Sequence, residues 1–202
     1  MGGSAALCVG IGKFFVDLGF IRAEEVYDFA RELEDLFHGE SSGVDIAVSL
    51  AGHGLAFERG GHRSNLFVEW TPKWFLSYSG KKGVTSECVK KVKEIWVRSE
   101  AQGQKIDNKM REAVALAKSA LSMTKSSAAF EQLAKGIQLA GECFEEWGLC
   151  EGALHKHLDF IRGAGAAAVK PTGSGGGGYV LSLWKEEPPE SLRSILIPLP
   201  IS

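Results

Sequence analysis

The chain has 202 residues, of which 45% are hydrophobic and 24% charged, so it can fold as one large globular domain or two small ones. Its net charge of -2 argues against broad electrostatic binding to nucleic acid or to an anionic membrane surface. No apolar run approaches the length of a membrane span, and no basic segment precedes the apolar N-terminal stretch, as it would in a signal peptide.

The first part of the chain is predicted to form two helices followed by extended segments. Residues 4–20 read as an apolar helix. Residues 23–38 have the apolar spacing of an amphipathic helix, and Gly39 is a plausible C-cap residue. The periodicity then changes, and three segments are predicted to be extended: 45–58, 64–70 and 74–79.

The second part is predicted to be mainly helical until its last forty or so residues. Helices return at Thr85, a plausible N-cap residue. Strands are predicted at 165–170 and 178–184, and the extended tail at 193–201 contains prolines that suit an edge strand. Because helices and strands are segregated, the predicted class is α+β, with a domain boundary near residue 73. The predicted helices are 85–98, 105–123, 126–147 and 151–163.

The cysteines form no CxxC pair, and none lies within four residues of a histidine. This pattern predicts reduced thiols in core positions of a cytoplasmic protein, without a disulfide framework or a zinc site. The cysteines are Cys8, Cys88, Cys143 and Cys150.

The first candidate site is the start of the chain, Met1-Gly2-Gly3-Ser4-Ala5-Ala6-Leu7. A glycine loop that leads into a helix can hold phosphate, because free backbone N–H groups and the helix dipole both favour an anion. A hydroxyl group in the first turn can also join the ligands of Mg²⁺. A flexible start of the chain explains the same residues equally well, since short glycine patterns are weak evidence.

The second candidate site is the segment HGESSGVD at residues 38–45, where a helix is predicted to give way to a strand. Asp45 could act as a base toward a substrate hydroxyl group. Glu34, eleven residues earlier, could hold Mg²⁺ near a phosphate. The alternative is a solvated turn in which Asp45 makes local hydrogen bonds, and the residues alone favour that alternative.

The third candidate site is the loop KPTGSGGGG at residues 170–178. A flexible linker is the simplest alternative, but this loop joins two apolar strands rather than two domains. The sequence therefore predicts a hairpin-like unit whose glycines let the backbone approach a ligand or another loop.

Taken together and in order, these three segments resemble the motifs of the GHMP small-molecule kinases. The family carries a PxxxGLGSSAA phosphate loop, and its mevalonate kinases add HGxPSGxDN and KxTGAGGGG segments. This chain has MGGSAAL, HGESSGVDIAV and KPTGSGGGGYVLSL, and the resemblance covers essentially its whole length. It implies the two-domain GHMP fold, with residues 1–73 as the latter part of a ribosomal-protein-S5-like domain and residues 74–202 as a ferredoxin-like domain.

The resemblance also implies an activity: ATP-dependent, Mg²⁺-dependent phosphorylation of the primary hydroxyl group of mevalonate, in isoprenoid synthesis in the cytoplasm. Asp45 matches the catalytic aspartate, and Ser4 and Glu34 match the Mg²⁺ ligands. Ser42 and Thr85 match residues on the substrate side. The phosphate-binding residues would be Gly2, Gly3, Ser4 and Ala5. The glycines that brace the phosphate loop would be Gly173, Gly175, Gly176 and Gly177.

The chain departs from the family pattern at several positions. Ser41 replaces the usual proline of the family motif. Ile46 replaces the asparagine that follows the catalytic aspartate, a position expected to lie beside the substrate, so this departure bears most on the choice of substrate. Gly3 replaces a serine and Tyr179 a cysteine. Met1 aligns inside the phosphate loop, so the first strands, a catalytic lysine and much of the adenine pocket are expected to be missing.

Two alternatives to an active mevalonate kinase stay open. One is a GHMP kinase for another alcohol, such as phosphomevalonate, a sugar or homoserine. The other is an inactive fragment or subunit that needs its missing N-terminal segment. The expected partners are the small-molecule alcohol and either a second copy of the chain or that segment, supplied separately. Because strands before the phosphate loop are expected to be missing, the chain alone is expected not to turn over mevalonate. Neither nucleic acid nor membrane is expected as a partner.

Overall fold

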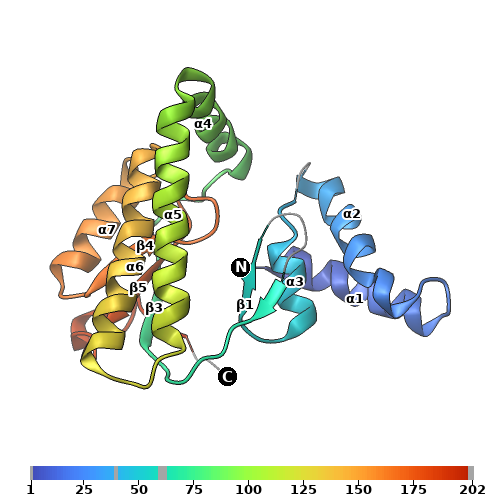
Figure 1. Cartoon of the computed structure of the whole chain (residues 1–202), viewed down its shortest axis with the longest axis horizontal. Coiled ribbons are helices and arrows are strands. Elements are labelled where there is room, and N and C mark those ends of the chain that lie inside the picture. Colours follow the sequence, from blue (N-terminus) through green and yellow to red (C-terminus); the bar gives the residue numbers. More distant parts are fainter. Residues whose placement is uncertain (1, 39–40, 59–62, 200–202) are drawn as a thin grey trace. The chain divides into compact units, whose positions relative to one another are not determined.

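The computed structural model describes residues 2–38, 41–58 and 63–199, and it divides the chain into two compact units (Figure 1). The first unit comprises residues 1–67 and the second residues 68–201. Helices and antiparallel strands are segregated along the chain, which confirms the predicted α+β class. No helix in the described ranges combines the length and apolar character that a membrane span needs.

The first unit packs three helices around a small apolar core. Gly12 lets α1 approach α2 closely, because a Cβ atom there would lie 3.0 Å from Cγ1 of Val26. The buried core cluster contains residues of all three helices: Ala5, Cys8, Val9, Ala30 and Ile46. The elements of this unit are α1 (Gly3–Asp17), the 3-10 turn η1 (Ala23–Glu25), α2 (Val26–His38), α3 (Val44–Ala51), and the antiparallel strands β1 (Leu55–Phe57) and β2 (Arg63–Asn65).

The prediction that residues 45–58 are extended is wrong for most of that segment, because α3 occupies its first half. Val44, Ile46 and Val48 alternate along the sequence as they would in a strand. Packing decides against the strand: the side chain of Ile46 is fully buried in the core cluster formed with α1 and α2. Glycines with positive φ angles begin and end the helix at positions 43 and 52.

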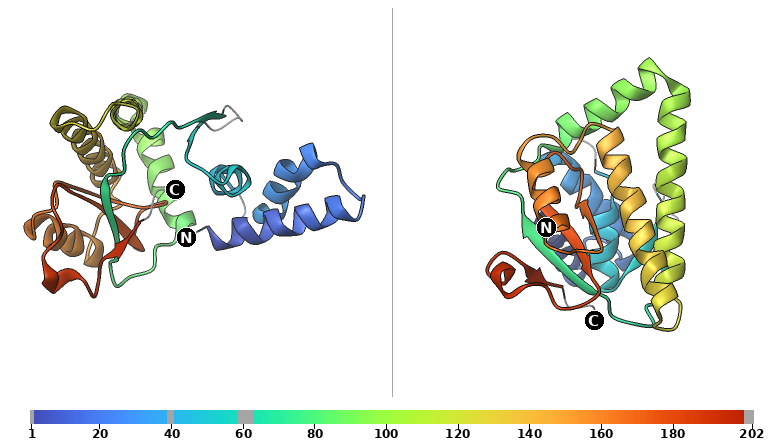
Figure 2. Two further views of the ribbon diagram at one scale, coloured as in Figure 1. Left: turned by 90° about the horizontal axis from the view of Figure 1, so that it is seen from below. Right: turned by 90° about the vertical axis from the view of Figure 1, so that its left-hand side faces the viewer.

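The second unit is a four-stranded antiparallel sheet with helices packed against it (Figure 2). The strand order is β4-β5-β3-β6, so the proline-containing tail strand lies at an edge, as predicted. The elements of this unit are β3 (Lys73–Tyr78), α4 (Thr85–Arg98), α5 (Glu100–Leu121), α6 (Ser127–Glu146), α7 (Ala153–Gly163), β4 (Ala168–Pro171), β5 (Tyr179–Trp184), the 3-10 turn η2 (Glu190–Leu192) and β6 (Ile197–Pro198).

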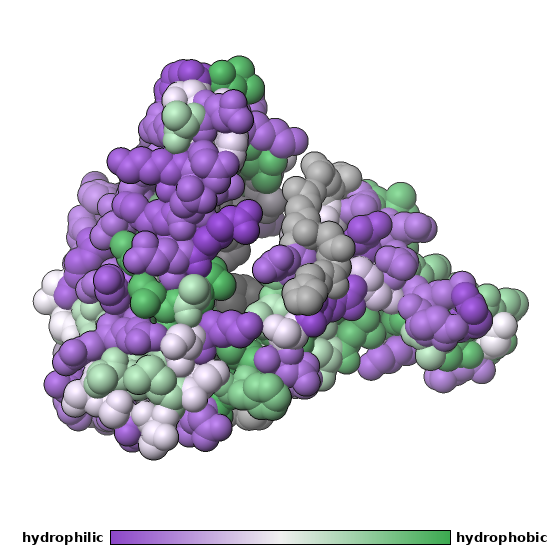
Figure 3. Space-filling view, in the orientation of Figure 1, coloured by the Kyte–Doolittle hydropathy of each residue, from purple (hydrophilic) through white to green (hydrophobic). Residues whose placement is uncertain are grey.

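Helix α6 lies between α5 and the sheet, and glycines on α6 make both contacts close. A Cβ atom at Gly136 would lie 2.8 Å from the carbonyl oxygen of Ala113 on α5. A Cβ atom at Gly141 would lie 2.9 Å from the carbonyl oxygen of Val169 on β4. Figure 3 shows mostly hydrophilic side chains on the face of this unit where α5 runs, in keeping with an amphipathic helix that turns its small residues inward.

The helix predictions for the second unit are confirmed, and the largest difference is at the start of α5. The helix predicted at 105–123 begins five residues earlier, at Glu100, because the side chain of Ser99 accepts a hydrogen bond from the amide of Gln102. Thr85 is the first helical residue rather than the N-cap, which is Val84. The strands predicted at 165–170 and 178–184 form the expected antiparallel hairpin.

All four thiols are free and buried, as predicted. Burial raises the pKa of Cys150 to about 12 and that of Cys143 to about 11. We therefore expect a thiol reagent at pH 8 to label the native protein slowly at every cysteine and the urea-unfolded protein rapidly at all of them. Mass spectrometry after timed alkylation measures both rates, and one rapidly labelled thiol in the native state would contradict the expectation.

Cys143 and Cys150 should make the folded state less stable at high pH. Because their pKa values are raised in the folded state, the folded chain holds protons that the unfolded chain releases. Their contribution is complete below the ordinary thiol pKa of 9.0 and is lost as the pH rises from about 9 through the folded-state pKa values of about 11 and about 12. Urea unfolding at several pH values measures this change.

Candidate functional site

The first predicted site lies at the N-terminus of α1. Gly2 has a φ of 69°, and the helix begins at the next residue without a side-chain cap. A Cβ atom at Gly2 or Gly3 would have nothing within 4 Å, so the approach to this helix end is open within the structure. Ala5 is fully buried and anchors the first turn in the core. This geometry suits an anion, which the helix dipole attracts.

Glu34 is buried, with 5% of its surface exposed, although it is charged. One carboxylate oxygen, Oε1, lies 3.4 Å from the hydroxyl of Ser4, and the other, Oε2, accepts a hydrogen bond of 2.5 Å from the hydroxyl of Ser41. In the described part of the chain, no lysine, arginine or histidine forms an ion pair with Glu34. A buried carboxyl group without a described cation is costly, and its oxygen atoms are of the kind that a hard metal cation prefers.

Ser41 organises the turn between α2 and α3. Its amide donates a hydrogen bond of 2.5 Å to Oδ1 of Asp35, and its hydroxyl oxygen accepts one of 3.1 Å from the amide of Gly43. The family proline at this position has no N–H group and could not bind Asp35. In the sequence, Ser41 is only a departure from the family pattern, and its bonds to Glu34 and Asp35 could not be recognised without the tertiary structure.

Asp45 is the second residue of α3, and its side chain is exposed. Ile46, next to it, belongs to the same buried cluster as Ala5, the neighbour of Ser4. One core therefore holds the starts of α1 and α3. The side chain of Ile46, the residue expected to bear most on the choice of substrate, is fully buried in that cluster.

The remaining residues of the second motif make only local contacts or lie outside the described residues. Ser42 is exposed, and its hydroxyl oxygen lies 3.4 Å from the amide of Val44, as in a local turn. Gly39, the predicted C-cap residue, and Glu40 lie outside the described residues, as does Met1.

The third predicted site is a loop with five left-handed or similarly unusual glycines in the second unit. They are Gly173, Gly175, Gly176, Gly177 and Gly178, with φ between 61° and 149°. Only glycine adopts such angles without strain. The glycines therefore allow one particular backbone conformation of the loop, and their presence does not indicate a flexible linker.

This glycine loop packs against the segment between β3 and α4. The amide of Gly178 donates a hydrogen bond of 2.6 Å to the carbonyl of Lys81, and the amide of Gly176 donates one of 2.8 Å to the carbonyl of Leu149. A Cβ atom at Gly83 would lie 2.5 Å from the carbonyl oxygen of Gly175. The sequence predicted that the backbone of this loop approaches either a ligand or another loop. In the structure it approaches another loop, the segment between β3 and α4.

Thr85 and Ser174 extend this contact, because the hydroxyl of Ser174 lies 3.3 Å from that of Thr85. The structure thus brings Thr85, a predicted substrate-side residue, to the glycine loop. Gly83 was not recognised from the sequence, since nothing in an isolated glycine shows that another backbone will pass within contact distance.

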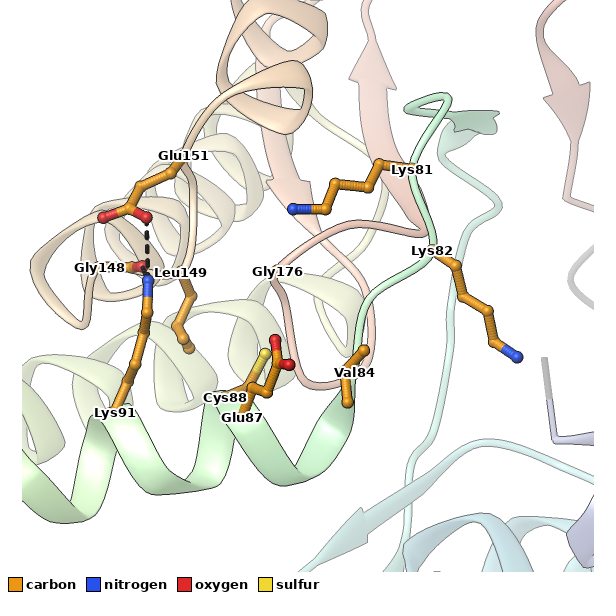
Figure 4. Close-up of a pocket in the computed structure, with 10 residues that line it drawn as sticks. All are labelled: Lys81, Lys82, Val84, Glu87, Cys88, Lys91, Gly148, Leu149, Glu151 and Gly176. Carbon is orange, nitrogen blue, oxygen red and sulfur yellow. Dashed lines mark hydrogen bonds and ion pairs between the residues drawn. The ribbon is translucent and has the colours of Figure 1, made fainter.

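A small cavity of about 90 Å³ lies beside this contact, with Gly176 and the buried thiol of Cys88 in its wall (Figure 4). Lys91 spans one side, donating hydrogen bonds of 2.9 Å to the carbonyl of Gly148 and to Oε2 of Glu151. The residues predicted to take part in catalysis are not among those that line this cavity, and its principal charged pair is already satisfied.

The chain is similar to mevalonate kinases of known sequence. It is 30% identical over 200 residues to the mevalonate kinase of Thermococcus onnurineus (strain NA1), covering 98% of this chain and 59% of the relative. It is 30% identical over 178 residues to the mevalonate kinase of Aeropyrum pernix, covering 87% of this chain and 54% of that relative. The chain thus spans less than two thirds of the length of these relatives. No family model matches it.

Solved structures show the same fold. The structure of L. major mevalonate kinase in complex with R-mevalonate has a TM-score of 0.77 to this chain at 19% identity, covering 92% of this chain and 57% of that one. The Methanococcus jannaschii mevalonate kinase has a TM-score of 0.64 at 21% identity, covering 89% of this chain and 56% of that one. These identities are too low to carry more than the fold.

Proposed function

We propose that this chain, which is similar to the mevalonate kinases, serves the transfer of the ATP γ-phosphoryl group to the primary hydroxyl group of mevalonate, as a member of the GHMP kinase family. This reaction would supply phosphorylated precursors for isoprenoid synthesis. The observation that carries the proposal is the buried side chain of Glu34, which no described cation pairs with, beside Ser4 at the N-terminus of α1.

The residues at this place fit a magnesium ion together with the phosphates of ATP. Glu34 and Ser4 offer a carboxylate and a hydroxyl oxygen, which are ligands that Mg²⁺ accepts. Among the described residues no group of three or more histidine, cysteine or acidic side chains forms a metal site. Phosphate oxygens and water would therefore complete the coordination, as is usual for Mg²⁺. When bound, the ion would neutralise charge on the phosphates.

The protein's own residues would bind and orient the reactants. The N-terminus of α1, with Gly2, Gly3 and Ala5, would hold phosphate oxygens through backbone amides. Asp45, exposed in the first turn of α3, would accept or orient the proton of the attacking hydroxyl group. Ser42 and Thr85 would serve on the substrate side. Such positioning is most of what a phosphoryl transfer requires from an enzyme.

The glycine loop would contribute through its fixed shape. Its residues Gly173 and Gly175–Gly177 match the glycines that brace the phosphate loop in the family. The hydrogen bonds of this loop to Lys81 and Leu149 hold it in one conformation within the second unit.

A substrate panel tests the proposal directly. The longest natural polypeptide that carries these residues would be assayed for ADP release with ATP, Mg²⁺ and one alcohol at a time: mevalonate, phosphomevalonate, homoserine or galactose. We expect kcat/KM to be highest for mevalonate, and no turnover after removal of Mg²⁺ with a chelator. A higher kcat/KM for another alcohol, or no phosphorylation of mevalonate, would contradict the proposal.

A further inference from the structure

An arginine in the first unit lies over an aromatic ring whose hydroxyl group packs against the residue before α3. The guanidinium carbon of Arg63, the first residue of β2, lies 3.4 Å from the centre of the Tyr27 ring on α2. Arg63 is exposed and forms no ion pair with any residue in the described ranges. We propose that Arg63 is a specificity-determining residue that binds the carboxylate group of the substrate; this rests on the function proposed above.

Stacking on Tyr27 makes the Arg63 side chain suitable for this role. A guanidinium group that lies over an aromatic ring is attracted to the ring face and keeps its edge N–H groups available in the plane. Those N–H groups match the two oxygens of a carboxylate, which arginine can bind in a bidentate manner. The ring also restricts the side chain before a ligand arrives, so less conformational freedom is lost on binding.

Tyr27 in turn fixes the position of Arg63 relative to the second motif. A Cβ atom at Gly43 would lie 2.3 Å from the Tyr27 hydroxyl oxygen, so this hydroxyl packs directly against the backbone of Gly43. Gly43 has a φ of 76°, immediately precedes α3 and stands two residues before Asp45. The stacked pair and the candidate base therefore belong to one local assembly around the start of α3.

The chemistry of mevalonate fits this arrangement. Its reacting hydroxyl group and its carboxylate lie at opposite ends of the molecule, so recognition needs a proton acceptor at one end and a cation at the other. Asp45 supplies the acceptor in the function proposed here. Arg63 supplies a cation whose charge no described carboxylate neutralises. Arg63 would thus favour acidic alcohols over neutral ones of similar size.

The test compares an acidic substrate with a neutral one in two proteins. The longest natural polypeptide that carries these residues and its Arg63→Gln variant would be assayed with mevalonate and with mevalonate amide. We expect Arg63→Gln to raise KM for mevalonate about tenfold to a hundredfold, which corresponds to the loss of charge-assisted hydrogen bonds. The KM for ATP, and kcat/KM for the amide, should remain within about threefold of the wild-type values, since neither depends on this cation.

A control variant and a binding measurement distinguish an error in the assignment of Arg63 from an error in the proposed function. Arg22 is also exposed but is paired with Glu24 and Glu25, so Arg22→Gln should leave both substrates unaffected. Calorimetry should show weaker binding of mevalonate to Arg63→Gln without a change in melting temperature. Equal losses for the acid and the amide would overturn the assignment of Arg63. A wild-type protein that phosphorylates only alcohols other than mevalonate would instead overturn the proposed function.

Discussion

Replacing Asp45 with asparagine is expected to lower kcat with mevalonate by about a hundredfold to ten-thousandfold, the range that general base catalysis contributes. Asparagine has nearly the same shape as aspartate but cannot accept the proton of the hydroxyl group. Asp45 is exposed at the start of α3 and makes no hydrogen bond with another described side chain, so the fold should not depend on its charge. The KM for ATP should change little, because the phosphate-binding start of α1 is unaltered.

Steady-state kinetics and a direct measurement of ATP binding check this expectation together. Asp28, which lies in the first turn of α2 and is also exposed, offers a matched control, and Asp28→Asn should have nearly wild-type kinetics. If Asp45→Asn kept a kcat within a few-fold of the wild type, Asp45 would not be the base. If the variant lost ATP binding and kcat together, its role would be structural.

Gly177→Ala is expected to destabilise the second unit by about 3 kcal/mol or more, from backbone strain and overpacking combined. Gly177 has a φ of 149°, and a Cβ atom there would lie 2.5 Å from the carbonyl oxygen of Lys81 and 2.9 Å from the amide nitrogen of Gly83. Both neighbouring atoms belong to backbone, so neither can rotate away as a side chain would. The glycine loop and the segment before α4 would have to separate.

Urea unfolding followed by tryptophan fluorescence measures this change in the free energy of unfolding. Gly163→Ala at the end of α7 is the control, because a Cβ atom there would have nothing within 4 Å and its φ is not positive. The control should be neutral or slightly stabilising, since alanine favours a helix over glycine. A Gly177→Ala protein with wild-type stability would show that the two loops are not in close contact.

The helices of the second unit were predictable because their apolar residues recur with helical spacing over long segments. The predicted helix at 85–98 agrees with α4, and those at 126–147 and 151–163 agree with α6 and α7 to within two residues at each end. Helix α3 was not predictable in the same way. It has eight residues, its β-branched positions alternate, and only its contact with α1 makes a helix the better solution.

In the candidate site too, some residues could be predicted from the sequence, whereas others could be recognised only from their contacts in the folded structure. Asp45, Glu34 and Ser4 could be proposed from motif spacing, and the structure adds the contact between Ser4 and Glu34. Ser41, Tyr27 and Gly83 could not, because each owes its role to a contact with a residue outside its own helix or loop. Glu34 lies seven residues from Ser41, and Gly43 lies sixteen residues from Tyr27. Neither periodicity nor spacing records such contacts.

The glycine loop also shows that composition is a poor guide to mobility. Glycine has the largest conformational entropy in the unfolded chain, so ordering five such residues between Gly173 and Gly178 opposes folding more than ordering the same number of alanines would. The hydrogen bonds from Gly176 and Gly178 to two other segments must offset that loss. The most glycine-rich stretch of the chain is therefore among the parts whose order depends most on the rest of the unit being folded.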